Sequence, residues 1–375
     1  MSTQSFRAPA GERMPFIDAL KAVGSQFIVL HHLAFYGPMS DWTHQLAPDL
    51  VAWFSQHARI AVQVFLVVAG FLAARSLAPH GHLRSNRPLT LLWQRFVRVS
   101  LPLMAALLLA MLCTEVARAW MTHDSLPDPP SLWQFVAHAL LLHSLLGVDS
   151  LSAGVWYVAI DVQLYALLLG LLWLARRLGE TAPLLVAAVA LASLFYFNLD
   201  SDWDNWAIYF FGAYGLGALA YWLSRAQAGR GATAWWTGMA LLTGLALAMD
   251  WRTRIALALG VALALAWAHR SGWLFTWPRS RVLGYLGRIS YGVFLLNFPV
   301  ALVVNAWFTR YASPDAEVQT LGVLVAWLAC NLAGAAFHHG VEQRLGQLGR
   351  ARPTAAAVQA EAPGVEIAGS QRSRR

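Results

Sequence analysis

Apolar residues along this chain gather into long runs separated by short polar segments. A helix needs about 20 apolar residues to cross the hydrocarbon core of a bilayer, and about ten runs approach that length. They cover residues 16–36, 56–77, 99–121, 156–175, 182–199, 206–224, 233–250, 254–269, 282–308 and 318–341. The pattern predicts an all-α fold, a polytopic integral membrane bundle of about ten transmembrane helices.

The linkers between these runs alternate in charge. Arginine-rich linkers occur at 75–98, 176–180, 225–231, 269–281 and after residue 344. Acidic linkers occur at 124–130, 199–205 and 311–317. Because cytoplasmic loops are enriched in Lys and Arg, the alternation predicts a multi-pass protein with both termini in the cytoplasm.

One further apolar stretch, residues 131–150, does not fit this count. If it crossed the membrane as an eleventh span, Arg176 and Arg177 would lie on the outer side. We therefore expect an additional interfacial or re-entrant helix near 131–150, on the outer side.

The overall composition agrees with a membrane protein. Of the 375 residues, 58% are hydrophobic and only 12% are charged, whereas soluble proteins carry about 25% charged residues. The expected organisation is a cytoplasmic segment at 1–14, a transmembrane domain at 15–345 and a disordered cytoplasmic tail at 346–375. The N-terminus is polar and shows no signal-peptide cleavage site. The Ala- and Arg-rich composition suits a high-GC bacterium and predicts its inner (cytoplasmic) membrane.

The charge, the cysteines and the absence of known motifs argue against a nucleic-acid partner, a disulfide framework and a metal site. Lys and Arg number 27 against 19 Asp and Glu, a net charge of +8, and Lys21 is the only lysine. In a membrane protein such an excess sets topology, so no nucleic acid is expected as a partner. Cys113 and Cys330 lie in apolar runs and are expected to be free thiols. No HExxH, Walker, GxGxxG or GxSxG motif occurs, so no metal is expected.

Polar side chains within the apolar runs are costly in a membrane, which makes them candidates for function. They are His31, His32, Asp161, Gln163, Asn297, His338, His339 and Glu342. His31 and His32 close the first run, and a neutral imidazole is a good general base. Adjacent helix positions point about 100° apart, so both rings rarely face one site. The alternative interpretation is a pair of interfacial polar caps.

Two further groups stand near the predicted membrane surface or within a span. Arg95 and Arg98, spaced i,i+3 in "QRFVR", share one helix face and can hold a phosphate, or they are ordinary cytoplasmic anchors. Asp161 and Tyr165 share a face of the fourth span, where the aspartate orients a histidine or makes a structural interhelical hydrogen bond.

Other features of these segments have simpler interpretations. Arg13, Asp18 and Lys21 cluster at the cytoplasmic mouth of the first span. Asp18 and Lys21 are spaced i,i+3 and are most simply a solvated ion pair. The stretches 70–77 and 212–220 are rich in small residues, which is typical of close helix packing.

Five segments together resemble acyltransferase family 3, a family of ten-span integral membrane acyltransferases. They are "FIDALKAVGSQFIVLHH", "VQVFLVVAGFLAARSL", "QRFVR", "VWYVAIDVQLYALLL" and "LGRISYGVFLLNFPV". The resemblance covers residues 13–345. It implies transfer of an acyl group, often acetyl, from acyl-coenzyme A to a hydroxyl, mostly of a surface glycan or an exported sugar.

The resemblance also implies roles for particular residues. The family's histidine lies fourteen residues after its aspartate, which from Asp18 leads to His32 as the catalytic histidine and leaves His31 as its neighbour. Arg95 and Arg98 match the pair thought to engage the coenzyme A phosphates. Supporting positions that fall in or beside the matched segments are Asp18, Lys21, Gln163, Tyr165 and Tyr291.

Three residues depart from the family pattern. Ala69 stands where the family has a serine, Asp161 where it has a glutamate, and Asn297 where it has a histidine. The last change removes a proton-transfer group, which indicates a divergent subfamily or one that has lost activity.

The expected mechanism places coenzyme A on the arginines and the thioester at His32, with Asp161 orienting the imidazole. Fourteen residues at a rise of 1.5 Å put His32 about 21 Å from Asp18, nearer the outer face than the arginines. The acyl group would then cross the membrane through the protein to an external acceptor. One alternative is a transporter or flippase of sugars or lipids, which would have broken helices at the midplane. The other is a non-catalytic scaffold, whose function would not change in the His32→Ala variant.

Overall fold

The computed structural model describes residues 13–179, 181–227 and 229–348, and within these ranges it contains helices and no strand. The predicted all-α fold is confirmed. The long helices are α1 (Pro15–Phe35), α4 (Val62–Leu77), α5 (Pro88–Trp120), α7 (Val155–Leu178), α8 (Ala182–Phe195), α9 (Ala207–Arg225), α10 (Arg230–Met249), α11 (Thr253–Ser271), α13 (Arg281–Tyr311) and α14 (Ala316–Phe337). Shorter helices are α2 (Pro38–Leu46), α3 (Pro48–His57), α6 (Leu132–Ala139), α12 (Trp273–Thr276) and α15 (Gln343–Leu348). The predicted tail lies almost wholly outside the described residues.

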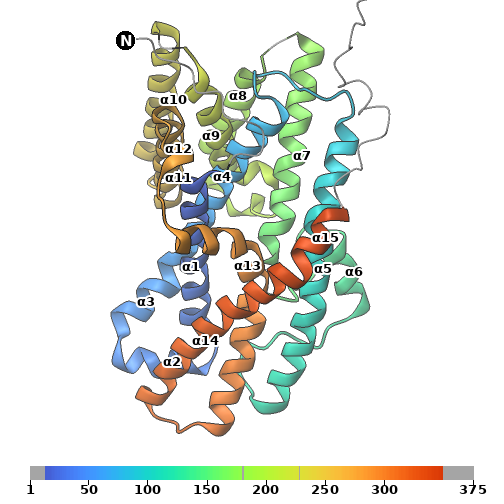
Figure 1. Ribbon diagram of the computed structural model, residues 1–375, viewed down its shortest axis with the longest axis vertical. Helices are drawn as coiled ribbons and strands as arrows, with labels where there is room; N and C mark the ends of the chain where they lie inside the picture. Colours follow the sequence, from blue (N-terminus) through green and yellow to red (C-terminus); the bar gives the residue numbers. More distant parts are fainter. Residues whose placement is uncertain (1–12, 180, 228, 349–375) are drawn as a thin grey trace, which may run out of the picture.

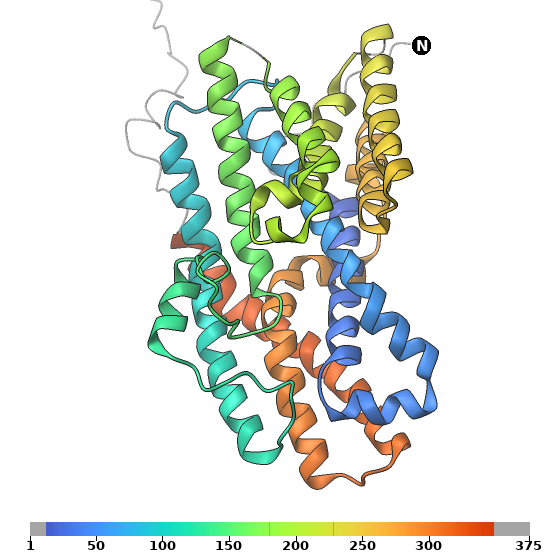
Figure 2. The ribbon, with the colours of Figure 1, turned by 180° about the vertical axis from the view of Figure 1, so that it is seen from behind.

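The long helices form two groups that share α7 as a bridge. In the first group α13 is central and packs against α1, α5 and α14. In the second group α9 is central and packs against α4, α8 and α11. Helix α7 contacts both α5 and α9. Figures 1 and 2 show α8 to α11 at one end of the long axis, and α2, α3 and the α13–α14 turn at the other end.

Seven helical segments of the described chain are long and apolar enough to cross a membrane. They are Pro48–Leu77, Pro88–Trp120, Val155–Leu178, Ala182–Leu199, Ala207–Arg225, Arg281–Tyr311 and Ala316–Leu345. Each overlaps one of the predicted spans. The other three predicted spans, 16–36, 233–250 and 254–269, are also helical, as α1, α10 and α11, and their crossing of the membrane stays a prediction.

The stretch 131–150 does not form an eleventh span. It contains only the eight-residue helix α6, which starts at a capping box formed by Ser131 and Gln134. His138 and His143 follow, with parallel rings whose centroids lie 4.0 Å apart. His138 donates from Nδ1 to the carbonyl of Gln134 and accepts at Nε2 from the N–H of Leu151. Burial lowers the pKa of His143 to about 4, so this pair is neutral at pH 7.

Small residues allow α4 and α9 to pack with their backbones almost in contact. A Cβ atom added to Gly70 would lie 1.9 Å from the carbonyl oxygen of Tyr214, and one added to Gly217 would lie 2.0 Å from that of Val67. Helix α9 is buried along nearly its whole length as a result. The two small-residue stretches therefore pack against each other, as close helix packing in a membrane requires.

Gly217→Ala should lower the melting temperature of the purified protein, because the new methyl must push α4 and α9 apart. Overpacking of this kind costs about 1–3 kcal/mol. Gly170→Ala is the matched control: Gly170 lies in α7 with nothing within 4 Å of an added Cβ, so this change should leave the melting temperature unchanged or slightly raised. Equal melting temperatures for both variants would contradict the close contact of α4 with α9.

Candidate functional site

The centre of the site is a hydrogen bond between His32 of α1 and Asn297 of α13. Nδ1 of His32 and Oδ1 of Asn297 are in direct contact, and both side chains are buried, with exposed fractions of 6% and 0%. The bond joins positions 265 residues apart in sequence. It is possible because α1 and α13 cross closely, at a point where a Cβ on Gly287 would lie 2.2 Å from the carbonyl oxygen of Asp18.

The amide of Asn297 fixes which nitrogen of His32 carries a proton. Nδ2 of Asn297 donates to the carbonyl oxygens of Val293 and Phe294, at 3.0 and 2.7 Å. Its Oδ1 must therefore face His32, and an amide oxygen only accepts. Nδ1 of His32 is the donor, so the neutral imidazole keeps its lone pair on Nε2. No described residue forms a hydrogen bond with that nitrogen.

His31 is held on the other side of α1. Its Nδ1 lies 3.2 Å from the carbonyl oxygen of Phe54, in α3, and its ring packs beside Phe35. The two histidines thus have separate partners, as the rotation of about 100° between neighbouring helix positions requires. Their different partners distinguish His32 as the site residue and His31 as a contact between α1 and α3.

The ring edge of His32 faces the start of α7. Gly154 precedes this helix in a left-handed conformation, with φ of +84°, and a Cβ placed on it would lie 3.7 Å from Cε1 of His32 and 3.2 Å from Phe294. Aromatic rings of Tyr36 and Phe298 cover the other sides of the imidazole, with centroids at 5.6 and 6.3 Å. His32 therefore sits in an enclosure formed by the rings of Tyr36 and Phe298 and by the backbone at Gly154.

A second polar contact joins α5 to α7. Nη2 of Arg95 donates to Oδ2 of Asp161 at 2.5 Å, with side-chain exposures of 27% and 9%. The guanidinium also lies over the ring of Tyr165, 5.5 Å from its centroid. Asp161 is thus bound to Arg95, and the group that orients His32 is Asn297. Nε of Arg95 is buried with no partner among the described residues, so the guanidinium still has an unused donor.

Arg98 lies on the same side of α5 and joins a cluster of charges. Arg95 and Arg98 are both close enough to Tyr165 to act on it electrostatically, and the guanidinium of Arg95 lies over its ring. Arg98 is also among the charges that act on Lys21, together with Asp18 and Glu342. Asp18 forms its ion pair with Arg13, at 3.0 Å, and not with Lys21 as the i,i+3 spacing predicts.

These contacts place His32 and the arginines along one face of α7. Positions 154, 157, 161 and 165 follow the helical repeat, so Gly154, Tyr157, Asp161 and Tyr165 share a face. Tyr157 packs on Phe294 with a centroid distance of 5.6 Å. Seven residues separate Gly154 from Asp161, a rise of about 10 Å. These four positions, here called the polar track of α7, run from the side of the His32 ring to Asp161, the partner of Arg95.

The remaining predicted residues make contacts between helices. Gln163 accepts from the N–H of Ala207 at 3.0 Å and donates to the carbonyl of Asn205 at 3.3 Å, which caps the start of α9. Tyr291 donates to the carbonyl oxygen of Val99 at 3.0 Å, tying α13 to α5. His338 pairs with Glu342 at 2.8 Å, and His339 lies 3.4 Å from the hydroxyl of Tyr285.

Sequence reasoning missed Gly154, Tyr36 and Phe294. The only local signal was a glycine directly before "VWYVAID", which is typical of a helix start that needs positive φ. No group of three His, Cys, Asp or Glu among the described residues could hold a metal ion. Within those residues Cys113 and Cys330 are free, and only Cys330 is fully buried.

Comparison with protein families matches residues 14–337 to a family described as an acyltransferase domain. The matched range includes His32, Arg95, Gly154, Asp161 and Asn297. No curated protein and no solved structure gave a match.

Asp161→Leu should lower the melting temperature more than the double change Arg95→Leu with Asp161→Leu does. The single change leaves the Arg95 charge between α5 and α7 without its partner, which for a buried pair costs about 3–5 kcal/mol, less here because Arg95 is 27% exposed. A double-mutant cycle with Arg95→Leu measures the coupling. Purely additive losses would show that Arg95 and Asp161 do not interact.

Proposed function

Because the chain belongs to acyltransferase family 3, and so is a membrane acyltransferase, we propose that it moves an acyl group, acetyl in the simplest case, from acyl-coenzyme A to a hydroxyl of a surface or exported glycan. The observation that carries this proposal is the state of His32: its Nδ1 is fixed by Asn297, its Nε2 has no described partner, and the polar track of α7 leads from it to Arg95.

The arginines supply a binding place for the donor. A coenzyme A phosphate is an anion with several acceptor oxygens, and guanidinium groups bind such oxygens in a fork geometry. Arg95 is held in place by Asp161 and Tyr165 while its buried Nε still lacks an acceptor. Arg98 adds a second positive charge beside Tyr165. The rise of about 10 Å along α7 is then the interval that the pantetheine arm crosses toward His32.

The chemical step uses Nε2 of His32 as a general base. Nε2 takes the proton of the acceptor hydroxyl as the oxygen attacks the thioester carbonyl carbon. The carbon–sulfur bond of the tetrahedral intermediate then breaks, and the coenzyme A sulfur leaves with the proton returned from Nε2. The products are the acyl ester and the free thiol. A second route uses the same lone pair to accept the acyl group on His32 before the acceptor enters; the two routes differ in whether an acyl-enzyme forms.

In this mechanism Asn297 positions His32, although the family has a histidine in place of Asn297. Its amide cannot transfer a proton, but it holds the imidazole in one tautomer and one orientation, as the partner groups of catalytic histidines do. Asp161 takes no part in orienting His32 and acts instead by fixing the guanidinium of Arg95. The family membership supports this proposal over the transporter and the scaffold.

His32→Ala should lower transfer of radiolabelled acetyl from acetyl-coenzyme A to glycan in membranes by a factor of about 10² to 10⁴, the usual contribution of a general base. His31→Ala should keep most of the activity, because His31 hydrogen-bonds to α3 and does not bind Nδ1 of His32, which Asn297 holds. Equal rates in both variants and wild type would contradict the proposal. Acid quench during turnover tests for labelled enzyme, which only the covalent route produces.

Asn297→Leu should lower kcat about 10- to 100-fold, the range seen for partners of functional histidines, with KM for acetyl-coenzyme A nearly unchanged. Asn297→Asp keeps an acceptor for Nδ1 and should restore part of the loss. Asn331→Leu is the matched control, because it removes an interhelical amide bond to Gln26 of α1 without touching His32. If both leucine variants lose activity alike, the role of Asn297 is only structural.

A further inference from the structure

A cluster of exposed tryptophans lies between α11 and α13, away from the residues of the proposed mechanism. Trp267, Trp273 and Trp277 are 53%, 42% and 48% exposed. Their rings form a row, with centroids 4.9 Å apart from Trp267 to Trp273 and 5.2 Å apart from Trp273 to Trp277. Trp277 also contacts Phe16, at 5.9 Å, so the row is fixed against the start of α1. Three tryptophans exposed in one place are typical of the interface between membrane and water.

The same segment is strongly basic. Residues 269–281 contain Arg270, Arg279 and Arg281 and no acidic residue, and all three arginines are exposed. Arg279 forms no ion pair or hydrogen bond with any described residue. Its guanidinium is therefore free to bind an anion from outside the chain.

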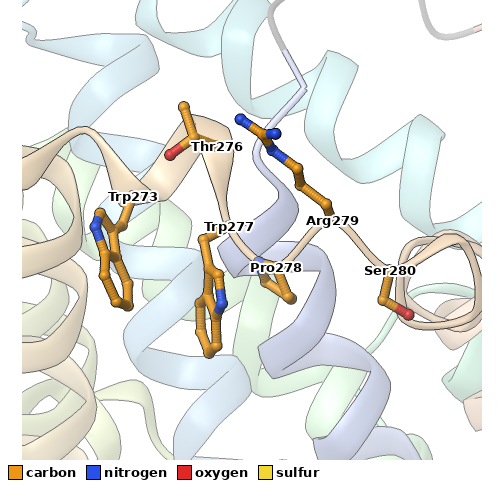
Figure 3. A pocket seen from close by; sticks show the side chains of 6 residues that line it. All are labelled: Trp273, Thr276, Trp277, Pro278, Arg279 and Ser280. Atoms are coloured by element: carbon orange, nitrogen blue, oxygen red, sulfur yellow. The ribbon is translucent and has the colours of Figure 1, made fainter.

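A depression of about 610 Å³ brings the aromatic and basic groups together. Its lining is Trp273, Thr276, Trp277, Pro278, Arg279 and Ser280. Figure 3 shows the two indoles extending to one side of the segment and the Arg279 guanidinium extending to the other side. The hydroxyls are already used, since Thr276 donates to the carbonyl of Gly272 and Ser280 caps α13. Arg279 is the charged group among the residues that line this depression.

We propose that this depression binds an anionic phospholipid. The guanidinium of Arg279 contacts the lipid phosphate, and Trp273 and Trp277 lie against the glycerol and the upper acyl chains. Tryptophan is the residue that prefers the membrane–water interface, and basic segments beside membrane helices attract anionic lipids. The alternation of charge along the chain also puts this segment on the cytoplasmic side, where anionic lipids concentrate. An adenine nucleotide is a different ligand for the same groups, but the two indoles already contact each other and leave no slot between them.

The test uses the full chain reconstituted in nanodiscs that contain equal amounts of phosphatidylglycerol and phosphatidylcholine. After transfer to detergent, retained lipid is counted by native mass spectrometry. Wild type should retain phosphatidylglycerol in preference, and Arg279→Gln should lower that retention about fivefold, the factor that corresponds to about 1 kcal/mol for one charge near the surface. Trp277→Leu should lower retention of both lipids.

Arg310→Gln is the control, because Arg310 is also exposed but lies at the far end of α13. It should leave retention unchanged. Equal retention of both lipids by wild type, or unchanged retention in Arg279→Gln, would overturn the proposal. So would binding of adenosine 3′,5′-bisphosphate that Arg279→Gln abolishes, since the depression would then be a nucleotide site. Arg279 has no described partner, so its replacement should not disturb folding, and an unchanged melting temperature verifies this.

Discussion

The ion pair between Arg95 and Asp161 is the contact on which the arrangement of the candidate site depends. It joins α5, which belongs to the helix group around α13, to α7, which also packs on α9. Inside a membrane protein a charge without a partner is far more costly than at a surface, so the pair strongly favours one position of α7 relative to α5. That position sets the distance from the arginines of α5 to the residues on the polar face of α7, including Gly154 beside His32.

The rest of the site follows from where α7 begins. Gly154 provides the left-handed turn at the helix start, and its lack of a side chain lets the edge of His32 and the ring of Phe294 approach. Glycine at this position thus permits both the positive φ and the close approach of the two rings. The imidazole of α1 meets α7 at Gly154 and the guanidinium of α5 meets it at Asp161. These two contact points are about two helical turns apart on one helix, and a rigid helix positions reacting groups better than a loop does.

Two of the residues that depart from the family pattern, Asn297 and Asp161, make defined contacts in the site. Asn297 cannot relay a proton, yet its amide is oriented by two carbonyls of its own helix and its oxygen faces His32. Asp161 is shorter than the family's glutamate, yet it reaches Arg95 directly. Both residues have a defined partner in the site. Their contacts therefore support the role that we propose for each of them.

The sequence by itself determined the class of fold and the identity of the polar groups. Apolar runs of spanning length predict helices because a bilayer leaves the backbone no other partners, and polar residues within them stand out because each is costly. The sequence did not reveal that Asn297 rather than Asp161 holds His32, or that 131–150 is a short capped helix with a neutral histidine pair. These outcomes depend on how α1, α5, α7 and α13 cross. Helix crossings arise from small-residue contacts between segments far apart in sequence, such as Gly287 against Asp18, and only the tertiary structure decides which partners they bring together.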